Sequence, residues 1–213
     1  MTVSARKRPA AAAPSARKGG KRGEIPLTVS RPELIINGND RDFRELVHNL
    51  FGFFALHERL RSGHGKYIGL GGVEYTVLIS IGHLARDGDV NVKTVADHLH
   101  LSGAFITATT NRLLKMGYIH KTVDTADRRR VTLTVSSKGR AALESLAPVQ
   151  SRLNDIEFAA LSRQEFLMLN DLLRRMIADS HRAVALQDYY LAGGEEPQAR
   201  RSPTGGKING TNP

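Results

Sequence analysis

The feature of this 213-residue chain that most constrains its fold is a change of hydrophobic period near Gly117. Upstream of that glycine, residues 102–116 carry apolar side chains at the spacing of an amphipathic helix. Downstream, residues 118–123 read as a strand, and residues 131–135 alternate apolar side chains with threonine. A helix followed directly by a short hairpin predicts a mainly α fold with a small β wing of two to three strands.

Apolar stripes and end signals predict six helices in total. Asp40 is the expected cap of the first helix, which reaches about Leu60 before glycines in the stretch 63–72 break the chain. Pro148 falls inside the fifth helix, and a Ser162-x-x-Glu165 capping box opens the sixth. The second to fifth helices are expected to begin near Val73, Val92, Ser102, and Ser136 or Ser137.

Positive charge is concentrated in two segments of the chain. Residues 1–23 hold seven basic groups and no acid, and residues 91–140 hold nine basic against three acidic groups, a net of +6. The formal net charge of the whole chain is +10, so the remaining residues are mildly acidic. This segregation is typical of a surface that faces nucleic acid. The N-terminal charge belongs either to a solubilising extension or to a basic arm that follows DNA.

Composition and spacing exclude several other classes of protein. Without cysteine, the chain has no thiol nucleophile, disulfide, thiolate metal site or cysteine redox switch. Its histidines lack the i, i+4 spacing that places two imidazoles on one helical face, so neither a metal nor a cofactor is expected. We find no Ser/His/Asp order, carboxylate pair or phosphate loop that would indicate an enzyme. No apolar run suits a membrane span, so the expected location is cytoplasmic.

The helix at 102–116 is the candidate element for reading DNA. Phe105 either touches a thymine methyl group or packs inside, and packing is favoured. Arg112 either clamps a phosphate or pairs with an acid such as Asp97. Small outward side chains would let the helix approach the bases closely. The candidate DNA-contacting residues of this helix are Ser102, Ala104, Thr107, Ala108, Asn111, Arg112 and Lys115.

The hairpin at 123–131 concentrates charge at its tip, in Asp127-Arg128-Arg129-Arg130. An arginine at such a tip can enter a minor groove, where narrow A·T-rich stretches deepen the negative potential. An acid beside it serves DNA binding only if it holds the turn or steers a neighbouring guanidinium.

Residues from about 70 to 140 resemble the MarR family of bacterial winged helix-turn-helix transcriptional regulators. The pieces that carry the resemblance are Leu101-Ser102, Asn111-Arg112-Leu113 before Gly117, the wing 127–130 and the exit 135–140. The family's D-x-R wing signature falls on Asp127 and Arg129. The resemblance therefore implies that Arg129 enters the minor groove, that Asp127 orients it, and that Arg128 and Arg130 flank the backbone. Two departures are Asn111 where aspartate is common and Val135-Ser136 where Leu-Thr is usual.

The resemblance also implies a homodimer that binds double-stranded DNA at a pseudo-palindromic operator, most simply as a repressor. A small aromatic or phenolic effector would bind beside the dimer helices. Candidate residues for that cleft are His57, Arg61, His64, Tyr67, Tyr75 and His83. The alternative reading is an architectural DNA-binding protein of weak specificity that relies on its basic arm.

The predicted organisation has five segments. Disordered tails occupy 1–32 and 192–213. Between them lie an N-terminal dimerisation helix and linker at 33–70, the winged helix-turn-helix domain at 71–140 and C-terminal dimerisation helices at 141–191.

Overall fold

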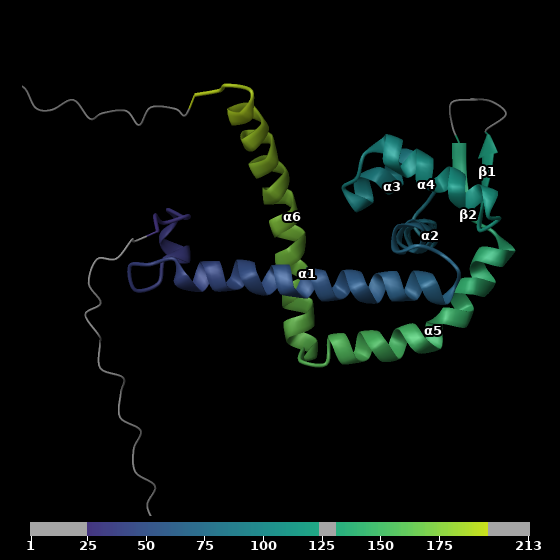
Figure 1. Ribbon diagram of the computed structural model, residues 1–213, viewed down its shortest axis with the longest axis horizontal. Coiled ribbons are helices and arrows are strands. Elements are labelled where there is room, and N and C mark those ends of the chain that lie inside the picture. The colour runs from purple at the N-terminus through teal and green to yellow at the C-terminus, as the bar shows by residue number, and fades with distance from the viewer. Residues whose placement is uncertain (1–24, 124–130, 196–213) are drawn as a thin grey trace, which may run out of the picture. The chain divides into compact units, whose positions relative to one another are not determined.

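The computed structural model describes residues 25–123 and 131–195, which form six α-helices and a two-stranded sheet (Figure 1). The predicted fold class is confirmed, and two of the two to three expected strands are formed. The chain divides between Thr134 and Val135 into two compact units, which are described in turn. The elements are a 3-10 turn η1 (Pro32–Leu34), α1 (Arg41–Tyr67), α2 (Gly72–Leu84), α3 (Val92–Leu99), α4 (Gly103–Lys115), β1 (Ile119–Val123), β2 (Val131–Val135), α5 (Ser137–Glu157) and α6 (Arg163–Leu191).

Asp40 stands at the N-cap position of α1, but the predicted capping bond is wrong. Its side chain accepts no hydrogen bond from a backbone N–H group of the first helical turn. Instead it accepts from Thr28 N and Thr28 Oγ1, both at 2.8 Å, and from Arg44 Nε at 3.0 Å. Arg44 and then Thr28 hold the pKa of the Asp40 carboxyl well below its usual range. The carboxylate is used to tie the preceding segment against the start of α1 rather than to cap the helix.

The glycines that were expected to end the first helix near Leu60 do not do so. Gly63 and Gly65 lie inside α1, which continues to Tyr67, and the chain turns only at Gly69, where φ is +76°. The physical reason lies at Gly65. A Cβ atom there would meet the carbonyl oxygen of Gly71 at 2.6 Å. Glycine at this position therefore serves a close crossing between α1 and the loop before α2, not a helix break.

Replacing Gly65 with alanine is expected to destabilise the protein by about 1–3 kcal/mol, because backbone atoms rather than a flexible side chain occupy the space that the methyl group needs. Gly63→Ala is the matched control, since no atom lies within 4 Å of its Cβ position, and it should stabilise α1 by up to about 1 kcal/mol. Urea unfolding followed by circular dichroism measures both. Equal effects of the two substitutions would contradict the close crossing.

Helices α2, α3 and α4 build the core of the first unit. Their fully buried side chains are Val77, Leu78, Ile81, Val95, Ile106, Thr109, Thr110 and Leu113. Local signals set the helix ends. Asn91 and Thr94 bond reciprocally as a capping box at the start of α3, and Ser102 Oγ accepts from Phe105 N at 3.2 Å to start α4 where predicted. Between them His100 takes a left-handed conformation with φ of +54°.

The hairpin is anchored at its base. Gly117 ends α4 with φ of +78°, as predicted, and the next residue, Tyr118, donates its hydroxyl to Ile68 O at 2.7 Å. Leu133 N on β2 donates to Val90 O at 2.7 Å. A third strand of the sheet would pair with β2 at this position. Val90 lies in the short link between α2 and α3, and the sheet of the described residues has two strands because this link pairs through a single bond.

The second unit contains α5 and α6. Ser136 caps α5 by accepting from Gly139 N at 3.0 Å, and Pro148 lies inside the helix as predicted. Figure 1 shows α5 as a bent helix. The predicted capping box of Ser162 and Glu165 starts α6, which has no buried residue along its 29 residues. Among the described helices, none combines the length and the apolar character needed to cross a membrane.

Candidate nucleic-acid interface

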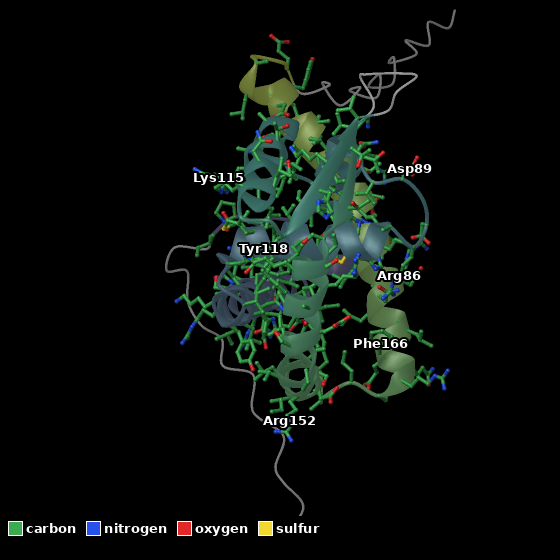
Figure 2. The ribbon with its side chains drawn as sticks, turned by 90° about the vertical axis from the view of Figure 1, so that its right-hand side faces the viewer. Arg86, Asp89, Lys115, Tyr118, Arg152 and Phe166 are labelled. Carbon is green, nitrogen blue, oxygen red and sulfur yellow. The ribbon has the colours of Figure 1, made fainter. Side chains whose placement is uncertain are left out.

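Helix α4 exposes small and polar side chains on the side away from the core. All five side chains predicted for that side are exposed: Ala104, Thr107, Ala108, Asn111 and Lys115. Figure 2 shows Lys115 extending outward from the helix. Thr109, on the opposite side of this helix, is fully buried. Thr107 Oγ1 donates to Gly103 O at 2.8 Å, so toward an external partner it offers a methyl group and an acceptor oxygen.

The prediction that Phe105 packs inside is wrong, because 42% of this residue is exposed. One side of the ring borders a hollow of 210 Å³ that is also lined by Val77 of α2 and by Leu99 and Leu101 at the end of α3. Phe105 follows the Ser102 cap within the first turn of α4, and the next residue, Ile106, is the one that is fully buried. Burial there depends on the neighbouring helices, which local sequence does not specify.

Arg112 forms an ion pair, one of the two alternatives predicted from the sequence, but its partner is Glu74 and not Asp97. Its Nε lies 2.8 Å from Glu74 Oε1, and its Nη2 donates to Thr109 Oγ1 at 3.2 Å. Asp97 pairs instead with Lys93 on its own helix. The Arg112 side chain keeps 50% of its surface exposed, so the ion pair leaves part of the guanidinium open to a phosphate.

Glu74 was not identified by sequence reasoning. It lies in the first turn of α2, and its side chain is 17% exposed. With Arg112 it borders a hollow of 520 Å³ whose other lining residues are Gly69, Leu70, Gly71, Lys115 and Met116. Glu74 and Arg112 are 38 positions apart, and no local pattern announces such a pairing. The ion pair joins the start of α2 directly to α4.

Lys121 is a second residue that the sequence did not reveal. From β1 its Nζ donates to Asn111 Oδ1 at 2.7 Å, which links the strand to the exposed face of α4. Burial lowers the pKa of the Lys121 ammonium group.

Predicted wing residues Asp127, Arg128, Arg129 and Arg130 lie outside the described residues. The structure defines only where the hairpin begins and ends, at Val123 on β1 and Val131 on β2.

This part of the chain is similar to proteins of known family. A model of the MarR family matches residues 68–130, the segment from just before α2 to the end of the hairpin loop. Over these residues the chain is similar to the MarR family. The HTH-type transcriptional regulator YwhA of Bacillus subtilis is 31% identical over 80 residues, which are 38% of this chain and 58% of that protein. The chain spans little more than half the length of the first curated relatives it matches, 58% and 55%.

Solved structures similar to this chain include a mutant MarR from E. coli complexed with operator DNA. It has a TM-score of 0.54 at 19% identity and covers 63% of this chain and 95% of that one. Another is BpsR of Bordetella bronchiseptica, whose DNA binding is regulated by 6-hydroxynicotinic acid. Its TM-score is 0.51 at 23% identity, with 61% of this chain and 90% of that one covered. At these identities the shared property is the fold.

Three of the six predicted effector residues lie where α1 meets α2. His64 and Tyr75 are buried, and their rings meet edge to face with centroids 5.5 Å apart. Arg61 donates from Nη1 to Thr76 Oγ1 at 2.8 Å and pairs with Glu58 through Nη2. The His64–Tyr75 contact and the Arg61–Thr76 bond are therefore two neighbouring links between α1 and α2.

The other three predicted effector residues do not share these contacts. His57 stacks on Phe53 with ring centroids 5.7 Å apart, and Tyr67 is 58% exposed. His83 faces His98 at the same centroid distance, 5.7 Å. Burial, followed by the charges of His83 and His100, lowers the pKa of His98. Over the part of the chain that the structure describes, no three His, Asp or Glu side chains are arranged to hold a metal ion.

Proposed function

We propose that this chain is a homodimeric transcriptional repressor that binds a pseudo-palindromic operator through α4 and the hairpin 123–131. The observation that carries the proposal is the exposed face of α4, where Ala104 and Ala108 leave room for bases and Thr107, Asn111 and Lys115 supply polar groups. The net charge of +6 over residues 91–140 suits a phosphate backbone. The MarR solved with operator DNA, which has the same fold, supports this assignment.

Exposed apolar side chains on two long helices support dimer formation. On α1 these include Phe51, Phe54 and Leu56, with exposures of 64%, 54% and 59%. On α6 they include Leu167, Met176, Ile177, Val184 and Leu186. Apolar surface of this extent is typical of an interface between subunits. A two-fold dimer would present two copies of α4 to successive major grooves, about one helical turn apart.

We propose that the effector binds where Arg61, His64 and Tyr75 link α1 to α2. A guanidinium and two aromatic rings at one helix crossing suit a small aromatic acid. The regulation of BpsR by 6-hydroxynicotinic acid is a precedent for this class of ligand in a protein of the same fold. Binding at the crossing of α1 and α2 would shift the dimer away from its DNA-competent state.

Selection of bound sequences from random DNA, combined with the mass of the complex in solution, tests the proposal. We expect an inverted repeat with half-sites about 10 base pairs apart, bound by two chains. A screen of aromatic acids for operator release then tests the effector site. Binding by a single chain, or the absence of any enriched sequence, would contradict the proposed function.

The basic segment 1–23 favours a second candidate, an architectural protein with weak sequence preference. Deleting this segment is expected to reduce the slope of log affinity against log salt by up to about six, since each neutralised phosphate contributes about 0.9. A chain of full length with these seven basic residues replaced by glutamine separates charge from length. For a repressor, both variants keep the sequence preference of the parent chain. Loss of that preference would favour the architectural role.

A further inference from the structure

The contact between Lys121 and Asn111 constrains what α4 can recognise. Lys121 Nζ donates to Asn111 Oδ1 at 2.7 Å, and Asn111 is exposed on the outer face of the helix. An ammonium group has donors and no acceptor, so it can bind only the oxygen of the amide. The Nδ2 group of Asn111 therefore points away from Lys121, and no described residue accepts a hydrogen bond from it.

The base of the hairpin holds Lys121 in place. Ile119, two residues earlier on β1, is 1% exposed, and Tyr118 is anchored through its hydroxyl to Ile68 O at 2.7 Å. Packing of α4 against β1 fixes the strand relative to the helix. Because Lys121 is partly buried, water competes less for its ammonium group, and the bond to Asn111 is strengthened.

An asparagine amide that is held by a lysine prefers a different base from a free asparagine amide. A free asparagine reads adenine by donating to N7 and accepting from the N6 amino group. With its oxygen beside an ammonium group, the amide is poorly placed to accept from an amino group and keeps two N–H donors. Those donors suit guanine, which presents only acceptors, N7 and O6, in the major groove.

We propose that Lys121 is a positioning residue that makes Asn111 read guanine rather than adenine at one position of each half-site. The proposal rests on the proposed function, because it requires α4 to enter the major groove. Aspartate is common at this position in the family. A carboxylate has no N–H donor and could not make the contact that we assign to the asparagine.

Sequence selection with four variants tests this assignment. Lys121→Met removes the donor that holds the amide, whereas Lys121→Arg keeps a side chain that only donates. Asn111→Asp removes both N–H donors. Lys93→Met is the matched control, because Lys93 is an exposed lysine of the same unit that pairs with Asp97 on α3. Thermal melting of each variant checks that the fold is kept.

We expect the parent chain, Lys121→Arg and Lys93→Met to share a guanine preference at one position of the half-site. Lys121→Met should lower the guanine-to-adenine ratio there about fivefold or more, and Asn111→Asp should also weaken binding about fivefold or more. If Lys121→Met keeps the ratio, or weakens all sequences equally as a phosphate contact would, the assignment is overturned while the proposed function stands. If the parent chain enriches no sequence, both are overturned.

Discussion

Replacing Arg129 with alanine is expected to lower the affinity for operator DNA by about ten- to a hundredfold, the range for loss of a specific arginine contact. The residue stands in the D-x-R position of the hairpin, where a guanidinium can enter the negative potential of a narrow minor groove. Since Arg129 lies outside the described residues, this expectation rests on the sequence. Dimer formation and melting temperature should stay unchanged. A mobility-shift titration with the selected operator measures the affinity.

Arg86→Ala is the control for this prediction. Arg86 is exposed in the turn after α2, and its replacement removes the same charge from the same unit. Figure 2 shows Arg86 and Lys115 on opposite sides of the view. If Arg129→Ala and Arg86→Ala weaken binding equally, the effect of Arg129 is one of net charge and the wing makes no specific contact.

Replacing Arg112 with alanine is expected to impair both stability and DNA binding. The substitution leaves Glu74 without its partner at 17% exposure, which should cost about 1–2 kcal/mol of unfolding free energy, because the arginine end of the pair is half exposed. It also removes the exposed part of the guanidinium from the outer side of α4, and affinity for the operator should fall about tenfold. Urea unfolding and mobility-shift titration report the two effects separately.

Glu74→Gln separates the two roles of Arg112. The amide removes the negative charge but keeps the guanidinium on α4, so stability should fall while affinity for the operator stays within about twofold of the parent chain. A loss of affinity as large as that of Arg112→Ala would show that the ion pair only supports the helix and that Arg112 makes no contact with DNA.

The residues of this site differ in how far the sequence could predict them. The start of α4 at Ser102, its end at Gly117 and its inward Ile106 and Leu113 follow from capping and helical period, which involve residues within a few positions of one another. The exposed set on the outer face follows from the same period. The partners of Arg112 and Asn111 do not, because neither Glu74 nor Lys121 is on α4.

Local chemistry therefore determined the order of elements, the helix ends other than that of α1, and the change of period that makes a winged helix. Tertiary structure alone decided that Gly65 serves a close crossing, that Phe105 stays partly exposed, and that the oxygen of Asn111 is held by a lysine. The reason is the range of the interactions. Caps and periodicity act within one or two turns, whereas close approach, burial and ion pairing depend on which segments the complete fold brings together.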